Sequence, residues 1–291
     1  MTRTSILIVA ACALQVPPPP TGEQARFSTK ATAVIIDVAV TEGERPVLGL
    51  TRDDFVVMDN GVRQEIQDLT LERLPTDVHI TADISGSMRA ADRQIINEAI
   101  EQVGRALSPD DRVSTTVFWA HISQRTPLGP PSAIRTVSEA GHDTAVIDAM
   151  LLALVQPEIT GRRQFSIFMT DGVDTASHFT EATVLATARH AKGPMTVVLA
   201  PDRAPRSIGG TLRAVAIQTG GEVISLKDRS QLRETFSRAL ENFRSSYVVR
   251  YFPTGVAPGG WHSVNVSVKG GRYTVRARQG WGSPGSLLPE H

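Results

Sequence analysis

The hydrophobic pattern of the chain changes twice along its length. Apolar and polar residues alternate over residues 32–40, which is the period of a half-buried strand. Over residues 75–243 the apolar residues instead form short continuous runs, separated by segments of helical period. Such runs are typical of strands buried on both faces of a parallel sheet. The alternation returns after residue 243, so the pattern predicts an α/β core between two β units.

The central region contains five apolar runs that we predict to be strands, at residues 78–83, 113–119, 165–170, 195–200 and 222–226. Apolar residues at helical spacing lie between them, such as Ile96, Ile100 and Val103 in the first interval. Strands that alternate with helices favour an α/β fold with a doubly wound, mostly parallel sheet. Residues 122–126 are a candidate extra edge strand, in a hairpin with the strand before it.

The two flanking β units carry turn signals. Asn60-Gly61 predicts a two-residue type I′ hairpin in the first unit. Gly270-Gly271 predicts a hairpin in the second, pairing residues 262–269 with residues 272–278. Each unit is too small to fold well alone, so we expect the two to pack as one small antiparallel β domain built from both chain ends.

This pattern divides the chain into five regions. We expect a signal peptide and Pro-rich spacer (residues 1–20), an N-terminal β unit (26–75), an α/β domain (76–243), a C-terminal β unit that packs with the first (244–282) and a tail (283–291).

The beginning of the chain has the pattern of an export signal. A charged start precedes a short apolar run at residues 5–16, which is too short to span a bilayer. The single cysteine, Cys12, lies in Val-Ala-Ala-Cys, which resembles a bacterial lipobox, while Ala-Cys-Ala equally suits ordinary signal cleavage. We expect a periplasmic, cell-surface or secreted protein, and a lipoprotein attached to the membrane only if Cys12 is lipidated.

Composition excludes several classes of partner and site. With 30 basic and 30 acidic residues the net charge is zero, which removes the general electrostatic argument for binding nucleic acid. One cysteine allows neither an intramolecular disulfide nor a cysteine-based metal cluster. A local basic stretch remains near the C-terminus. This stretch has two interpretations, a solvated face or a surface that binds anionic glycans. Its members are Arg250, Lys269, Arg272, Arg276 and Arg278.

Polar side chains follow two predicted strands at their carboxyl ends, where open α/β sheets bind ligands. Asp83, Ser85 and Ser87 follow the first strand, Asp171 follows the third, and Thr144 begins a helix between them. We expect these side chains to converge. Two carboxylates and three hydroxyls form an all-oxygen set that suits Mg²⁺ or Mn²⁺ and suits soft metals poorly.

The spacing Asp83-x-Ser85-x-Ser87, with the distant Thr144 and Asp171, resembles the metal-ion-dependent adhesion site of von Willebrand factor A domains. The resemblance covers residues 77–243 and implies a Rossmann-like fold. It also implies that these five residues hold the metal directly or through water. One coordination position then stays open for an acidic group of a partner.

The flanking units extend the resemblance to nearly the whole chain after the leader. Asp59-Asn-Gly-Val-Arg-Gln-Glu-Ile66 and Tyr247-Val-Val-Arg-Tyr-Phe-Pro253 are similar to bacterial exported VWFA-related proteins. One departure from that family is His142-Asp143, which precedes Thr144 where a small residue is usual. Asp143 would add negative charge near the ion and widen its tolerance to Ca²⁺, and His142 would line the rim. We expect Asp174 to cap a helix or to lie behind the ligands.

Three enzyme patterns were compared with the sequence, and none of them fits. There is no Gly-x-x-x-x-Gly-Lys-[Ser/Thr] phosphate loop and no Gly-x-Ser-x-Gly elbow. An aspartyl-phosphate phosphatase would need a carboxyl group two residues after Asp83, where Ser85 stands. We therefore expect a non-enzymatic module that uses a divalent metal to capture an Asp or Glu side chain of a partner protein. The alternative is a structural envelope scaffold whose metal only stabilises the loops.

Overall fold

The computed structural model describes residues 33–71, 74–86, 90–138, 141–157, 159–201 and 208–282. The predicted leader and spacer with Cys12, the tail at residues 283–291 and the candidate ligand Ser87 lie outside the described residues. No helix in the described ranges is both long enough and apolar enough to cross a membrane.

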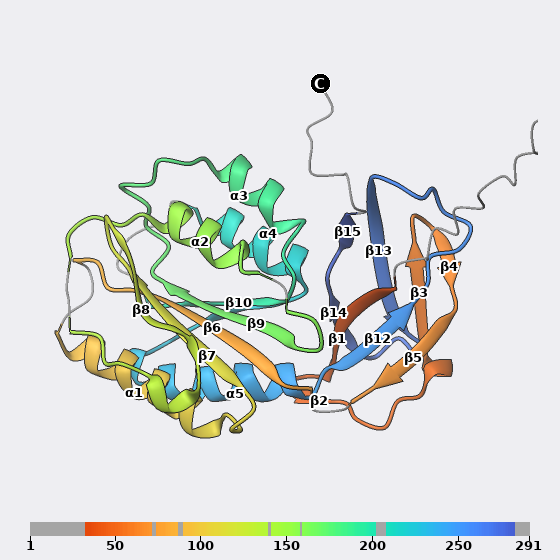
Figure 1. Ribbon diagram of the computed structural model, residues 1–291, viewed down its shortest axis with the longest axis horizontal. Helices are drawn as coiled ribbons and strands as arrows, with labels where there is room; N and C mark the ends of the chain where they lie inside the picture. The colour runs from red at the N-terminus through yellow and green to blue at the C-terminus, as the bar shows by residue number, and fades with distance from the viewer. Residues whose placement is uncertain are drawn as a thin grey trace, which may run out of the picture. The chain divides into compact units, whose positions relative to one another are not determined.

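A six-stranded sheet forms the centre of the α/β part, in the order β11-β10-β9-β6-β7-β8 (Figure 1). Every neighbouring pair is parallel except β7 and β8. The strands are β6 (Thr76–Asp83), β7 (Arg112–Phe118), β8 (Ile122–Gly129), β9 (Arg163–Thr170), β10 (Met195–Leu199) and β11 (Val223–Ser225). The prediction of a mostly parallel sheet with an antiparallel edge strand is confirmed.

Helices cover both faces of this sheet. They are α1 (Ala90–Ala106), α2 (Val146–Leu154), α3 (Glu181–Ala188), α4 (Gly209–Thr219) and α5 (Leu232–Arg244), with short 3₁₀ turns η2 (Pro131–Ala133) and η3 (Arg229–Gln231). Helices α1 and α5 pack on one face, and α2, α3 and α4 pack on the other (Figure 1).

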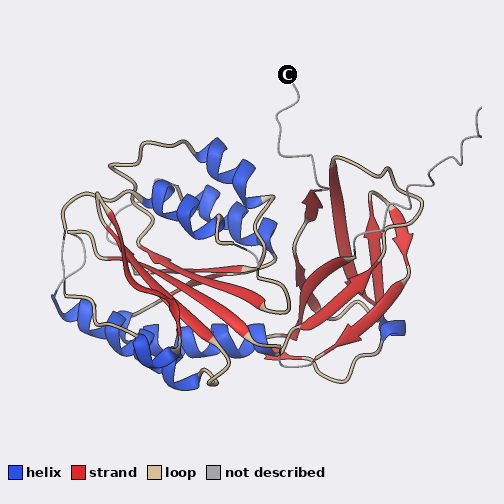
Figure 2. Cartoon of the chain, viewed as in Figure 1, coloured by secondary structure: helices blue, strands red, loops and turns tan. Residues whose placement is uncertain are grey.

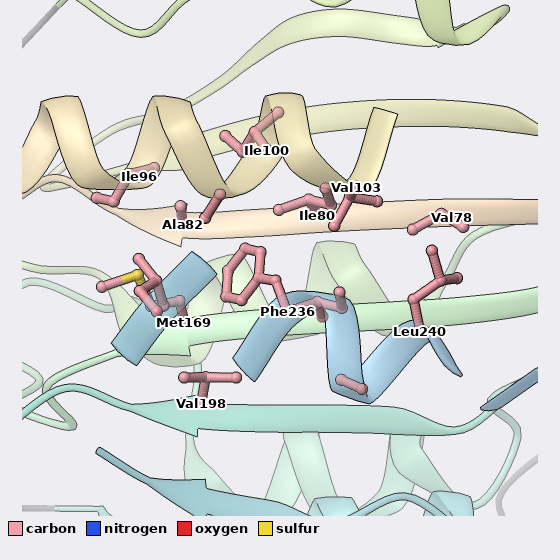
Figure 3. Close-up of a cluster of buried hydrophobic side chains, with 14 of the residues drawn as sticks. Val78, Ile80, Ala82, Ile96, Ile100, Val103, Met169, Val198, Phe236 and Leu240 are labelled. Carbon is pink, nitrogen blue, oxygen red and sulfur yellow. The ribbon is translucent and has the colours of Figure 1, made fainter. Parts of the chain in front are cut away.

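Alternating side chains of each strand supply the two cores, because successive residues of a strand point to opposite faces. Val78, Ile80 and Ala82 of β6 pack against α1 and α5, where Figure 3 shows them beside Ile100 and Phe236. Phe118 and Phe168 point to the other face, and their rings stack at 5.4 Å beneath α2, α3 and α4. The sheet is therefore buried on both sides, which explains the continuous apolar runs in the sequence.

Two antiparallel sheets form the β part, and each combines strands from the N-terminal and C-terminal regions. One has the order β14-β1-β12-β5, with β2 paired to β1, and the other has the order β15-β13-β3-β4. The N-terminal elements are β1 (Val34–Glu42), β2 (Arg45–Pro46), η1 (Arg52–Asp54), β3 (Phe55–Asp59), β4 (Val62–Gln64) and β5 (Ile66–Thr70). The C-terminal elements are β12 (Tyr247–Tyr251), β13 (Trp261–Val268), β14 (Thr274–Ala277) and β15 (Gly280–Gly282). Among the described residues, helices α1 to α5 belong to the α/β part, and the β part contains the short η1 (Figure 2). The small antiparallel β part built from both chain ends is confirmed.

One predicted hairpin in the β part is correct and the other is wrong. Asn60 and Gly61 both have positive φ, 45° and 78°, and join β3 to β4 as the type I′ signal predicted. The strands on either side of Gly270-Gly271 do not pair with each other as predicted: β13 pairs with β3, and β14 pairs with β1. The separation into two sheets lets Val264 and Val268 of β13 share one core with β1, whereas an isolated hairpin would leave one apolar face open.

A buried polar network holds four strands of the β part together. Asp59 Oδ2 accepts hydrogen bonds from the Tyr251 hydroxyl (2.8 Å) and from Trp281 Nε1 (3.0 Å), and its Oδ1 lies 2.8 Å from His262 Nδ1. Burial and the Asp59 carboxylate raise the pKa of Tyr251, so its hydroxyl stays protonated and donates. These side chains come from β3, β12, β13 and β15, and the network therefore joins both ends of the chain.

The α/β part and the β part are joined through Arg163 at the start of β9. Its guanidinium donates to Asp37 of β1 (2.8 Å), to the Ser246 hydroxyl (2.6 Å) and to the Phe243 carbonyl (3.0 Å). It also lies 4.0 Å from the centre of the Phe243 ring. Because Arg163 is buried, each of these contacts is shielded from water.

Candidate metal centre

The Asp83 carboxylate lies at the carboxyl end of β6, between β7 and β9, and is fully buried. Hydrogen bonds from Ser85 and Thr170 fix its orientation. The Ser85 backbone N–H donates to Oδ1 at 2.9 Å, and the Thr170 hydroxyl donates to Oδ2 at 2.8 Å. Asp83, Ile84 and Ser85 therefore form a local turn, in which the carboxylate accepts a hydrogen bond from the backbone N–H two positions later.

Asp171 follows β9 directly and is also buried. Its Oδ1 accepts a hydrogen bond from the Val173 backbone N–H at 3.1 Å. The Gly172 N–H donates to the Thr170 hydroxyl at 3.0 Å, and Gly172 has a φ of 82°, which favours glycine. This tight turn places the two carboxylates at the ends of neighbouring parallel strands.

The loop that carries Thr144 is bound to both strand ends. The Thr144 carbonyl accepts from the N–H groups of Thr175 (2.9 Å) and Ala176 (3.0 Å), and the Thr144 N–H donates to the Thr175 hydroxyl at 2.8 Å. On the other side, the Gly141 N–H donates to the Ile84 carbonyl at 3.3 Å. Three loops distant in sequence thus form one hydrogen-bonded surface that includes Asp83, Ser85, Thr144 and Asp171.

Charge is concentrated where these loops meet. Burial, with a smaller contribution from the Asp171 carboxylate, raises the pKa of Asp83 to about 6, although hydrogen bonds from Ser85 and Thr170 act in the opposite direction. A divalent cation between the two carboxylates would offset both the burial and the repulsion. The donors are all oxygen atoms of carboxylates and hydroxyls, so they fit a hard cation.

Other metal chemistries have no support in the part of the chain that the structure describes. Within those residues, no group of three or more His, Cys, Asp or Glu side chains gathers in a way that could hold a metal. Two carboxylates with hydroxyl neighbours are therefore the basis of the candidate centre.

The flanking acidic residues have structural roles. Asp174 Oδ1 accepts from the N–H groups of Val146 (2.8 Å) and Ile147 (3.3 Å), so it caps α2 from another loop. Asp148 accepts from the N–H groups of His178 and Phe179, both at 3.0 Å. Capping was one of the two roles expected for Asp174.

His142 and Asp143 lie on the exposed side of the Thr144 loop. Asp143 has a φ of 54°, a left-handed conformation that aspartate tolerates better than most residues. The His142 carbonyl accepts from the Ala120 N–H at 3.4 Å, which ties this loop to the end of β7 as well.

Sequence reasoning did not identify Thr170 or Thr175 as parts of the site. A signal for Thr170 existed, because a hydroxyl residue directly before Asp171 at a strand end shares the face of Asp83. No signal existed for Thr175, whose partner Thr144 is 31 positions away.

Comparisons with known proteins bear on the fold. No protein-family model and no curated protein matches the sequence. A solved von Willebrand factor type A protein from Catenulispora acidiphila is similar over 91% of this chain and 78% of its own, with 13% identity and a TM-score of 0.50. Proximal thread matrix protein 1 from the mussel byssus, solved with a zinc-occupied MIDAS motif, is similar over 64% of this chain with 13% identity and a TM-score of 0.51.

A second crystal form of the mussel protein gives a similar result, with 12% identity, 58% of this chain covered and a TM-score of 0.50. The chain spans about half the length of the mussel chains that it matches, 48% and 49%. These likenesses show that the α/β part has the von Willebrand factor A fold, as the motif resemblance implied.

Proposed function

We propose that this chain is an exported, non-enzymatic protein-binding module that captures an acidic side chain of a partner protein through a divalent cation. Asp83, Ser85, Ser87, Thr144 and Asp171 would hold the cation, and Mg²⁺, Mn²⁺ and Ca²⁺ are the candidates. Export rests on the apolar run at residues 5–16 of the sequence.

The observation that carries this proposal is the buried Asp83 carboxylate, held in place beside Asp171 where three loops meet. A carboxylate normally stays in water unless a partner compensates its charge. Hydrogen bonds from Ser85 and Thr170 orient the carboxylate oxygens of Asp83. The pKa of Asp83 nevertheless stays at about 6, above its ordinary value. The site therefore has the properties expected of a cation site.

The small number of carboxylates supports an acidic partner group. Asp83 and Asp171 supply the only acidic side chains of the proposed ligand set, and Ser85 and Thr144 contribute neutral hydroxyls. When bound, a divalent cation would supply an electrophilic coordination position for a carboxylate oxygen of the partner. The mussel protein with the same fold has a zinc-occupied MIDAS motif, which supports a divalent metal at this position.

Metal binding is tested by calorimetric titration of the full chain with Mg²⁺, Mn²⁺ and Ca²⁺. We expect one site, loss of binding in Asp83→Ala, and unchanged binding in Asp110→Ala. Asp110 is a matched control because it is an exposed acidic residue directly before β7. It therefore lies at the amino end of the parallel strands, whereas the proposed site lies at their carboxyl ends. Equal binding by both variants, or no binding by the parent chain, would contradict the proposal.

A second experiment separates a binding module from a scaffold with a purely structural metal. In the Mn²⁺-loaded chain, water bound to an open coordination position enhances the relaxation of bulk water protons. We expect acetate, as a probe for an Asp or Glu side chain, to displace that water and reduce the enhancement, while chloride at equal ionic strength does not. An enhancement that acetate leaves unchanged would favour the scaffold.

A further inference from the structure

We propose that the β part has a binding site of its own, for a short extended peptide segment that carries both an acidic and a basic side chain. The site is a cavity of about 670 Å³ beside the start of β3, where β4 passes into β5. This volume lies in the range of small-ligand sites, roughly 300–1,000 Å³. The charged residues that line the cavity are Arg52, Asp53, Arg63, Glu65 and Lys269.

The cavity lies where β4 leaves β3. The two strands pair only as far as Val57, which lies opposite Gln64. Glu65 then carries the chain into the other sheet, where β5 pairs with β12. Phe55 and Val56 therefore pair with β13 on one side and have no described strand on the other. Phe55, Gln64 and Glu65 line the cavity, so it occupies the place beside β3 that a longer β4 would fill.

The charged side chains at the cavity are exposed and form no ion pairs within the described residues. Arg63 and Glu65 make no hydrogen bond with a described residue either, although only one residue separates them. The same holds for the Asp53 carboxylate and the Lys269 ammonium group. Arg52 donates one hydrogen bond, to a backbone carbonyl of β5 at 3.3 Å. Positive and negative groups thus line one cavity, and no ion pair compensates them.

Charges of both signs determine which ligand fits. A purely anionic ligand is attracted by Arg63 and Lys269 but repelled by Asp53 and Glu65, and a purely cationic ligand meets the reverse. Arg63 and Glu65 lie on either side of the buried Gln64, and two residues of extended chain span about 7 Å. Acidic and basic side chains two positions apart in an extended peptide have the same spacing, so they can pair with Arg63 and Glu65 together.

The backbone and the apolar lining favour a peptide over a small zwitterion. Within the described residues β4 is an edge strand, so a peptide in extended conformation can form backbone hydrogen bonds along it. The buried Phe55 and the half-buried Ile66 supply the apolar surface of the cavity. A peptide can use the strand edge and the charged groups at the same time.

The test is an NMR titration of the full chain with the peptide Ac-Thr-Glu-Thr-Lys-Thr-NH₂. The buffer contains EDTA, so that the outcome does not depend on the candidate metal centre. The comparison peptides carry Glu, Lys or Ser at both charged positions. The double variant Arg63→Gln, Glu65→Gln is compared with Glu44→Gln, Arg45→Gln. Each variant removes one charge of each sign from exposed positions, and the second pair lies outside the cavity.

We expect saturable binding of the mixed peptide, with amide shifts concentrated at residues 51–55, 63–66 and 269. The cavity variant should bind it at least about fivefold more weakly than the parent chain, and the control variant should stay within about twofold. The comparison peptides should bind the parent chain at least about threefold more weakly than the mixed peptide.

Three results of the titration would overturn the proposal: no saturable shift, equal losses in the two variants, or equal affinity for the peptide with two Glu residues. Sedimentation in EDTA adds a fourth. A dimer that the cavity variant abolishes would show that a second copy of the chain, and not a peptide, occupies the cavity.

Discussion

The Thr170 hydroxyl donates a hydrogen bond of 2.8 Å to Asp83 Oδ2, and this bond joins the carboxyl ends of β9 and β6. The same hydroxyl accepts the Gly172 N–H at 3.0 Å, which starts the turn that carries Asp171. One buried side chain therefore orients one proposed metal ligand and anchors the loop of another. The site depends on residues that would not themselves touch the metal.

Replacement of Thr170 by valine removes this link while keeping the shape of the side chain. We expect Thr170→Val to lower the free energy of unfolding by about 1–3 kcal/mol, because the Gly172 N–H and the Asp83 carboxylate each lose a buried partner. We also expect Mn²⁺ affinity to fall by about tenfold or more. Urea denaturation and calorimetry measure the two effects.

Thr115→Val is the matched control for Thr170→Val. Its hydroxyl donates to Thr126 at 2.8 Å in the same sheet, and both side chains are buried. The control should lose stability to a similar degree and bind Mn²⁺ as the parent chain does. If both variants lost metal affinity equally, the loss would reflect general destabilisation and not the orientation of Asp83.

Acid sensitivity is expected from His79, which is buried in the middle of β6 with its Nδ1 2.8 Å from the Ser114 hydroxyl. Burial lowers the pKa of His79 to about 4, against an ordinary value of 6.5. Because the unfolded chain binds the proton more readily, this residue contributes stability that is complete above pH 6.5 and is lost as the pH falls towards 4. The loss is on the order of 3 kcal/mol.

Asp83 acts in the opposite direction over much of the same range. Its pKa is raised to about 6, so in the absence of metal its ionised form destabilises the fold and acid relieves that cost. The His79 contribution is therefore measured as a difference between the parent chain and His79→Gln, by urea denaturation in EDTA at several pH values from 7 to 4. We expect the stability gap between the two proteins to narrow as the pH falls. A constant gap would contradict the prediction.

Gly220 ends α4 in the left-handed conformation, with a φ of 84°. A Cβ at this position would lie 2.5 Å from the Arg278 nitrogen and 2.6 Å from the Ala277 carbonyl carbon, which are backbone atoms of the β part. We expect Gly220→Ala to lower the free energy of unfolding by at least about 2 kcal/mol, from backbone strain and this clash together. Thermal and urea denaturation measure the loss.

Gly61→Ala separates the two causes. Gly61 has a similar φ of 78°, but open space surrounds the position of its missing Cβ. Gly61→Ala should therefore lower the free energy of unfolding through backbone strain alone, by about 1 kcal/mol. Equal losses at Gly61 and Gly220 would mean that the close approach of Arg278 to α4 contributes nothing to stability.

The sequence was sufficient to predict the α/β fold and the place of the candidate site. Buried strands and amphipathic helices leave local patterns, and the topology of a parallel sheet brings the ends of β6 and β9 to one edge. Asp83 and Asp171 could therefore be placed together before any contact was known. The Asn60-Gly61 turn was also predictable, because its chemistry lies within two residues.

The tertiary structure decided the contacts that depend on residues far apart in the sequence. Gly270-Gly271 carries a local turn signal, but β13 pairs with β3 and β14 pairs with β1, and both strands contribute to one core with β1. The Asp59 network and the Thr170–Asp83 bond also leave no periodic pattern in the sequence. The local sequence pattern predicts only which face of a helix or strand is buried. Which residues contact that face depends on how the whole chain packs.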